Sequence, residues 1–519
     1  MRRDAVGRMR ASRSRGWRGL RALGRLGLCV GAVAAPAAAA QASPSGAVLQ
    51  YHKNATRDGH YVDPAVRRSA APRLHRDPAF RSSVPGSTYA QPLFWAATGP
   101  NEKDLLFVAT AQDRVYALDA STGAEVWQRS LGAPVGRAQL PCGNIDPVGV
   151  TGTPVIDAAS RTLFVDAMTT GDGGTQAHHR LAALSIDDGS MRRGWPVDVA
   201  AAGPESFAFK AAVQNQRGAL ALLGGTLYVP YGGHFGDCGD YHGWVVGVPT
   251  GRRASARAWA TRATGGGIWA PGGIASDGGS LYVATGNTFG ASSWGDGEAV
   301  IRLGPGPSFS REPADFFAPA TWAALDQADA DLGGSGPILV DIPGARPSRL
   351  VVALGKDGNA YLIDRSRMGG IGGAVAARRV SADAIIGAAA AYATGRGTYV
   401  VFPGRGIGCP RGPAGDLTAI RIGATSPPTI TIAWCADQHG RGSPIVTTPD
   451  GRSEAIVWSV GAGGDGRLRG FDGETGQVVF DGGGPGDAMS GVERYQTPIV
   501  AKGRIFVAGD REVYAFTTR

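Results

Sequence analysis

The sequence has few of the features that identify a membrane protein, a cytochrome or a nucleotide-dependent enzyme. After Ala40 no segment is long and apolar enough to span a bilayer. Only five of the 519 residues are cysteine, and none lies in the Cys-x-x-Cys-His pattern, so haem is not expected. The glycine runs 265–267 and 482–484 lack the following helix that phosphate binding needs, and no Ser-His-Asp or nucleic-acid motif occurs.

Aromatic residues are also scarce, at 8%, whereas Gly (81) and Pro (33) are abundant. Because hydrophobic residues still reach 43%, this composition indicates many tight turns and large loops rather than disorder. We expect residues 43–519 to form a single domain, since the repeats described below leave no room for a second fold.

Positive charge is concentrated at the N-terminus. Residues 1–42 hold nine arginines and one aspartate, which account for most of the formal net charge of +9. An apolar stretch from Leu26 to Ala40 follows the arginines, and it ends in a small-residue cleavage pattern. We therefore expect residues 1–42 to be a signal peptide and the protein to be exported, to the periplasm or beyond the cell. Less favoured alternatives are a twin-arginine signal at Arg2-Arg3, a start at Met9 and a lipid anchor on Cys29.

A repeated unit runs along the rest of the chain. In its clearest copy two runs rich in β-branched and aromatic residues, 105–110 and 115–118, flank a short polar segment and predict a β-hairpin. Asp119 and Gly123 favour a tight turn into a third strand that carries Trp127. Residues 90–95 supply one more short strand, so each unit predicts four strands.

Eight such units can be counted, and the last stops one strand short. A ring of blades leaves no exposed edge only if its last sheet is completed by the other end of the chain, and residues 73–84 can supply that strand. We therefore predict an all-β fold, an eight-bladed β-propeller of four-stranded antiparallel blades closed by an N-terminal strand. Seven blades is the alternative, because the fourth and sixth units are the least regular.

Four cysteines remain after the signal peptide: Cys142, Cys238, Cys409 and Cys435. An even number in an oxidising compartment favours two disulfides over free thiols. Of the three possible pairings we prefer Cys142 with Cys238 and Cys409 with Cys435. The second pair falls within one blade, and the first joins loops on one face.

The segment 117–127 resembles the tryptophan-docking repeat of pyrroloquinoline quinone (PQQ)-type β-propellers, and 471–480 resembles a second copy with Phe in place of Trp. The segments 142–157 and 241–245 are similar to a group of exported bacterial PQQ-binding-like propellers. The family includes quinoprotein alcohol and aldehyde dehydrogenases and also non-catalytic members, such as an outer-membrane assembly lipoprotein. The resemblance therefore implies the fold but not the activity. Its dehydrogenases commonly carry a disulfide between adjacent cysteines, and this chain has no Cys-Cys pair.

Long polar loops are predicted on only one face of the propeller, which we call the long-loop face. They are the connections 169–179, 231–242, 286–297 and 404–415 between second and third strands, and the links 133–150, 200–216, 319–335 and 482–495 between blades. The turns of the opposite, short-turn face are mostly minimal. Because elaborated loops on a rigid scaffold usually carry binding residues, we place any site on the long-loop face, around the central channel.

Several residues of the long-loop face are candidates for chemistry. Candidate catalytic residues are Asp331, Asp296 and His242; candidate contacts to a planar cofactor are Trp269, Arg217, Asn287 and Trp244; and candidate calcium ligands are Asp329, Asp331 and Asn287. One loop holds His234, Asp237, Asp240 and His242, and the equivalent loop of the preceding blade holds His178 and His179. This cluster could bind a transition metal or supply a general base. The structural alternatives are loop hydrogen bonds for the histidines and acids, and a core position between blades for Trp269.

Two functions follow from these observations. The first is an exported scaffold that binds a small molecule or a protein of the cell envelope through the long-loop face. The alternative is a quinoprotein-type dehydrogenase that uses PQQ and calcium to oxidise an alcohol or a sugar, with an aspartate as base. The first is favoured because the adjacent cysteines are missing. In either case we expect a monomer that binds no nucleic acid.

Overall fold

The computed structural model describes residues 45–171, 174, 176–202, 209–251, 255–410 and 414–518. The chain divides into two units, Met1–Gln41 and Ala42–Arg519, and all of the described residues belong to the second. The predicted signal peptide lies outside the described residues and stays a prediction. Within the described part of the chain, no helix has the length and apolar character that a membrane span requires.

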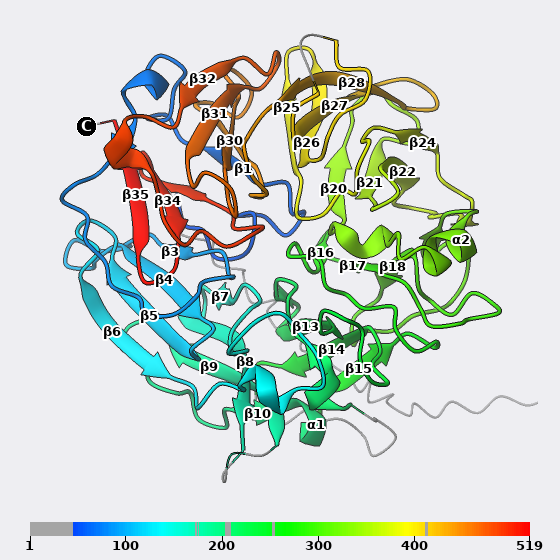
Figure 1. The fold of residues 1–519 in the computed structure, drawn as a ribbon, viewed down its shortest axis with the longest axis horizontal. Helices are drawn as coiled ribbons and strands as arrows, with labels where there is room; N and C mark the ends of the chain where they lie inside the picture. The colour runs from blue at the N-terminus through cyan, green and yellow to red at the C-terminus, as the bar shows by residue number, and fades with distance from the viewer. Residues whose placement is uncertain are drawn as a thin grey trace, which may run out of the picture. The chain divides into compact units, whose positions relative to one another are not determined.

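Eight sheets follow one another around a central axis, so the prediction of an eight-bladed β-propeller is confirmed (Figure 1). Blades 1 to 4, inner strand first, are β3 (Leu93–Trp95), β4 (Leu105–Thr110), β5 (Arg114–Asp119) and β6 (Glu125–Ser130); β7 (Val155–Asp157), β8 (Thr162–Thr170), β9 (Ala177–Ser185) and β10 (Val197–Asp198); β12 (Ala221–Leu223), β13 (Thr226–Gly233), β14 (Trp244–Pro249) and β15 (Arg257–Ala260); and β16 (Ala275–Ser276), β17 (Leu281–Thr285), β18 (Ala299–Leu303) and β19 (Phe316–Ala318). Blades 5 to 8 are β20 (Ile338–Asp341), β21 (Arg349–Leu354), β22 (Asn359–Asp364) and β24 (Ala376–Arg379); β25 (Ala390–Thr394), β26 (Gly397–Pro403), β27 (Leu417–Gly423) and β28 (Thr429–Ala436); β29 (Ile445–Thr448), β30 (Ile456–Val460), β31 (Leu468–Asp472) and β32 (Val478–Asp481); and β33 (Ile499–Ala501), β34 (Arg504–Ala508), β35 (Val513–Thr517) and β2 (His75–Arg76).

The seven-bladed alternative is wrong, because the two least regular units still form complete blades of four strands each. Three blades also gain a short extra strand that the repeat pattern does not predict: β1 (His60–Val62) and β23 (Gly370–Ile371), which pair in parallel, and β11 (Gln214–Asn215), which pairs antiparallel. Two short helices, α1 (Val199–Ala202) and α2 (Trp322–Gln327), lie in links between blades.

The ring is closed by the N-terminal part of the propeller, as predicted. β2 lies within the expected segment 73–84 and pairs antiparallel with β35, with His75 opposite Thr517. Further along, the Ser82 hydroxyl accepts a hydrogen bond from the Val513 amide at 2.7 Å. A closing strand from the opposite end of the chain removes the open edge that the last blade would otherwise present.

Tryptophans fasten neighbouring blades to one another. The Trp127 indole of blade 1 donates to the Ile186 carbonyl of blade 2 at 3.0 Å, and Trp434 of blade 6 donates to Gly473 of blade 7 at 2.8 Å. Each ring lies against a glycine of positive φ: a Cβ on Gly476 would be 2.7 Å from the Trp434 ring, too close for any larger residue. The repeat motif therefore serves blade packing rather than chemistry.

A segment that the repeat pattern does not predict, residues 48–62, runs along the inner strands, and we call it the axial segment. Its backbone bonds to the inner strands of blades 1, 2, 4, 5, 6 and 7 through Phe94, Ile156, Ser276, Leu339, Ala391 and Val446. Its last three residues are β1, which pairs with β29 (Figure 1). The axial segment thus ties six blades together in addition to the contacts that they make with one another.

Candidate functional site

Loops and links of the long-loop face pair with one another above the blades. Isolated backbone bridges join Pro134 to Thr169, Gly265 to both His242 and Thr288, and Ser335 to Gly387. The first three bridges connect an inter-blade link to a loop between second and third strands, and the last connects two links, so the two kinds of connection lie together on one face. The predicted site residues are located here.

Asp331 is the centre of a polar network that joins blades 3, 4 and 5. Its side chain is 3% exposed. One carboxylate oxygen accepts from the Trp269 indole at 3.0 Å and from Lys356 Nζ at 3.0 Å. The other accepts from the Asn287 backbone amide at 3.2 Å. The structure therefore brings together Asp331, Trp269 and Asn287, three residues that the sequence named.

Two buried acids make this network electrostatically unusual. Burial raises the pKa of Asp331, and the neighbouring Lys356 opposes that rise. Burial, reinforced by the charge of Asp331, raises the pKa of Glu298 to about 9, so Glu298 is neutral at pH 7. One Glu298 oxygen accepts from the Leu332 amide at 2.7 Å, while the other is buried without a partner. Such a cluster of perturbed carboxyl groups is typical of a functional site.

The predicted calcium ligands already bind a cation of the protein itself. Lys356 Nζ lies 2.9 Å from an Asp329 oxygen and 3.0 Å from Asp331, and its ammonium also sits 5.3 Å from the centre of the Trp269 ring. Calcium would have to displace this ammonium, because the same oxygens would bind it. Among the residues that the structure describes, no group of three or more His, Cys, Asp or Glu could hold a metal. The calcium assignment stays a prediction.

The other candidate residues have structural partners away from Asp331. Asp296 is fully buried and pairs with Arg262, whose Nη2 lies 3.0 Å away. His242 donates from Nδ1 to the Thr261 carbonyl at 2.9 Å. Trp244 is 8% exposed and belongs to the hydrophobic core between blades 2 and 3, so its ring is placed for packing. Their assignments to catalysis and cofactor binding remain untested.

Three of the four histidines of the predicted metal set, His178, His179 and His242, have different hydrogen-bond partners. His178 bonds Asp198 at 2.7 Å, and the His234 Nε2 is buried without a partner. His179 contacts Asp166 through Nδ1 at 2.8 Å and the Gln214 carbonyl through Nε2 at 2.9 Å. Burial alone would lower the pKa of His179, but Asp166 outweighs burial and raises it.

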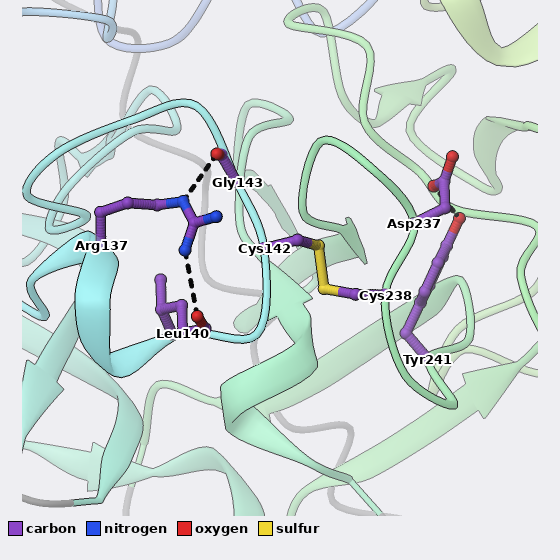
Figure 2. Close-up of a disulfide and its surroundings, with 7 residues drawn as sticks. All are labelled: Arg137, Leu140, Cys142, Gly143, Asp237, Cys238 and Tyr241. Carbon is purple, nitrogen blue, oxygen red and sulfur yellow. Dashed lines mark hydrogen bonds between the residues drawn. A yellow bond between two sulfur atoms is a disulfide. The ribbon is translucent and has the colours of Figure 1, made fainter.

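Two disulfides form with the preferred pairings, Cys142–Cys238 and Cys409–Cys435. Figure 2 shows the first, which joins the link before blade 2 to the β13–β14 loop. Arg137 holds its own loop by donating to the Gly143 and Leu140 carbonyls at 2.8 and 3.1 Å, and on the other side the Tyr241 hydroxyl donates to Asp237 at 2.7 Å. These bonds stiffen part of the long-loop face.

Arg217 lies in the link before blade 3, near the axis. Its Nη1 donates to the Thr151 carbonyl at 3.3 Å, and its guanidinium lies 5.8 Å from the centre of the Tyr89 ring. The Nη2 atom is buried and has no partner. Arg217 therefore keeps hydrogen-bonding capacity that the protein does not use.

The sequence did not single out Lys356 or Glu298. Lys356 lies in the short turn between β21 and β22, and Glu298 immediately precedes β18. The position of Lys356 in the sequence could have indicated it. A turn between second and third strands lies on the long-loop face, so a charged residue in that turn lies on the same face as the longer loops.

The comparisons with known proteins agree with the fold. A family model described as outer membrane protein assembly factor BamB matches residues 79–235. No curated protein matches the sequence significantly. Three solved structures share 14% identity with the chain. They are a quinohemoprotein alcohol dehydrogenase from Pseudomonas putida, with a TM-score of 0.65 over 91% of this chain and 80% of that chain; one from Comamonas testosteroni, with 0.61 over 92% and 81%; and a europium-containing methanol dehydrogenase, with 0.58 over 89% of both.

At 14% identity these structures establish the fold and leave activity open. The family match adds the repeat type over the first two blades and the first two strands of the third. The eight blades in one ring and the tryptophan-docking turns between them are consistent with a PQQ-like β-propeller repeat family.

Proposed function

We propose that this protein is an exported propeller that binds a small molecule or an envelope protein on its long-loop face and performs no chemistry. The two disulfides support export, because such bonds persist in oxidising compartments. The binding face is the region around Trp269, Asn287 and Lys356, where polar and aromatic groups of three blades meet.

One observation carries this proposal: protein donors already occupy the carboxylate of Asp331. Trp269 and Lys356 bind one oxygen, and the Asn287 amide binds the other. A general base needs a free oxygen within hydrogen-bonding distance of the proton it removes, and a calcium site needs carboxylates without a competing ammonium. A carboxylate held by three donors of the protein instead gives a rigid, polar surface for recognition.

A titration of the purified protein with PQQ, followed by the absorbance of the quinone, tests this proposal. We expect no tight binding that depends on Trp269. Tight binding in the wild type that is lost in Trp269→Ala, and kept in the packing control Trp259→Phe, would contradict it. Circular dichroism establishes that each variant is folded.

The second candidate is a quinoprotein-type oxidoreductase acting on an alcohol or sugar. It is favoured by the contact between the Trp269 indole and a buried carboxyl group of raised pKa. PQQ is a planar quinone with three carboxylates, and it would supply the two-electron acceptor. Trp269 fits such a plane, and Arg217 and Lys356 fit its carboxylates. The calcium ion that accompanies PQQ fits this site less well, because Asp329 and Asp331 already bind the Lys356 ammonium.

If this candidate is right, calcium should strengthen PQQ binding by competing with Lys356 for the two aspartates. Lys356→Met would then bind calcium more tightly than the wild type. Weaker calcium binding in Lys356→Met, or none in either protein, would remove the calcium-dependent form of this candidate.

A further inference from the structure

A groove follows the junction of blade 8 with blade 1, where the N-terminal segment closes the ring (Figure 1). It consists of two cavities of about 670 and 730 Å³, which adjoin because Ser83, Pro85 and Arg114 line both. The first cavity reaches Gly123 in the β5–β6 turn of the short-turn face, and the second reaches Asp510 in the β34–β35 turn of the long-loop face. This groove, which we call the seam groove, therefore extends along the blades from one face toward the other.

Three arginines from three separate segments line the seam groove. Arg81 belongs to the closing segment, Arg114 begins β5, and Arg511 lies in the β34–β35 turn. All three are exposed, and among the described residues none has an Asp or Glu oxygen within 4.0 Å. Arg114 donates to the Gln128 side chain at 3.1 Å. Because none of these guanidinium groups is held by a carboxylate, each keeps the paired N–H donors that bind one.

The acids of the seam groove balance only part of this charge. Asp510 accepts from the Thr88 amide at 3.3 Å, and its neighbour Arg511 is close enough to act on its charge. Glu125 is the single acid that lines the first cavity, which holds the other two arginines. The groove therefore keeps an excess of positive charge, and the potential inside it favours an acidic ligand.

A strand edge beside the groove favours a peptide as that ligand. β6 contributes Glu125 and Gln128 to the lining and is the outermost strand of blade 1. Among the described residues no strand pairs with its outer edge. An unpaired edge presents a row of N–H and C=O groups that an extended peptide can match. Blade 4 uses such an edge within the protein itself, because β23 pairs in parallel with its outer strand β19.

We propose that the seam groove binds an extended acidic peptide segment of another exported protein, with Arg114 near the middle of the segment and Arg81 and Arg511 toward its ends. Each cavity has the volume of a typical ligand pocket, so the two together suit a chain of several residues. This inference goes beyond the proposed function, since the seam groove lies between blades 8 and 1 and not at the Asp331 network of blades 3 to 5.

The test measures the binding of a short labelled peptide that alternates glutamate with serine, by fluorescence anisotropy at constant ionic strength. We expect this peptide to bind the purified protein at least about tenfold more tightly than the same peptide with glutamine in place of glutamate. Arg114→Gln should weaken the acidic peptide about tenfold, and Arg81→Gln or Arg511→Gln should weaken it several-fold. Arg452→Gln is the matched control, because Arg452 is exposed between β29 and β30 and its loss changes the net charge equally.

Equal affinity for the two peptides would overturn the proposal. Equal losses in folded Arg114→Gln and Arg452→Gln proteins would also overturn it, because attraction by net charge alone does not depend on the position of the arginine. Circular dichroism establishes that each variant is folded.

Two further probes test the peptide assignment. An acidic peptide with N-methylated serines keeps its charge but loses backbone donors, so it should bind several-fold more weakly than the unmethylated peptide. Unchanged affinity would show that charge alone is recognised and would overturn the assignment. An oligomer of galacturonic acid that binds as tightly as the acidic peptide, and is lost in Arg114→Gln, would make the groove a carbohydrate site instead. The PQQ titration is independent of all these results, so their failure leaves the proposed function standing.

Discussion

Replacing Lys356 by Met should destabilise the propeller in a pH-dependent way. The substitution leaves Asp331, whose side chain is 3% exposed, without its cation, while the Lys356 side chain is itself only 17% exposed. Breaking a buried ion pair by removing one partner typically costs about 3–5 kcal/mol. Because the Trp269 and Asn287 donors remain, we expect a value near the lower end, about 3 kcal/mol at pH 8.

The sign of the pH dependence follows from the pKa of Asp331, which burial raises. Without Lys356 that pKa rises further, so Asp331 takes up a proton at a higher pH and its uncompensated charge disappears. A carboxyl group with a raised folded-state pKa costs stability only where it is ionised, and the penalty of Lys356→Met should therefore shrink as the pH falls from 8 to 5.

Urea unfolding of the wild type and Lys356→Met at both pH values measures this penalty. The control is Lys502→Met. The side chains of Lys502 and its partner Asp104 are 48% and 27% exposed, so their ion pair should contribute less than about 1 kcal/mol to the free energy of unfolding. The double variant Asp331→Asn with Lys356→Met should recover part of the loss. A penalty below about 1 kcal/mol at pH 8, or one that grows toward pH 5, would refute the reasoning.

Three further predictions concern the scaffold. Gly476→Ala should lower the free energy of unfolding by about 2–4 kcal/mol, because the added Cβ would meet the Trp434 ring at 2.7 Å. The control is Gly224→Ala, where φ is also positive but the space is open, and it should lose only about 1 kcal/mol. Urea unfolding measures both. Burial lowers the pKa of His52 to about 3, so its stabilising contribution is present above pH 6.5 and is lost as the pH falls. The wild type should therefore lose about 2 kcal/mol more than His52→Asn between pH 7.5 and 5, and equal losses would show that His52 does not titrate this way. Replacing both cysteines of Cys142–Cys238 by serine should lower the free energy of unfolding by about 4.5 kcal/mol, and the same change at Cys409–Cys435 by about 3.5 kcal/mol. The first loss is larger because the paired cysteines are 96 residues apart in the sequence, compared with 26 for the second. A lower melting temperature for the Cys409–Cys435 variant than for the Cys142–Cys238 variant would contradict this.

The fold could be predicted because its information is local and repeated. Within nine residues, Asp119 and Gly123 specify a tight turn and Trp127 supplies a docking side chain, and the structure uses each in that way. The closing strand followed from counting strands. The axial segment could not be predicted, because residues 48–62 resemble no blade strand and bond to inner strands that are hundreds of residues apart in the sequence.

The candidate site was only partly predictable for a related reason. Asn287 and Asp331 lie in long polar loops, which mark them as candidates, and Trp269 lies in the link before blade 4. Lys356 lies in a minimal turn, and its partnership with Asp331 depends on the spacing of blades 4 and 5, which no sequence pattern states. The partners of Asp296 and Trp244 depend in the same way on neighbouring chain segments, Arg262 for one and the core between blades 2 and 3 for the other.

The central claim, binding without chemistry, is tested most directly by turnover. The purified protein is supplied with PQQ and calcium, and reduction of an artificial dye is followed with a panel of alcohols and sugars. Because three donors of the protein already hold the Asp331 carboxylate, we predict no dye reduction above that of the Asp331→Asn variant. Substrate-dependent reduction in the wild type that disappears in Asp331→Asn would contradict the claim and establish the protein as an oxidoreductase.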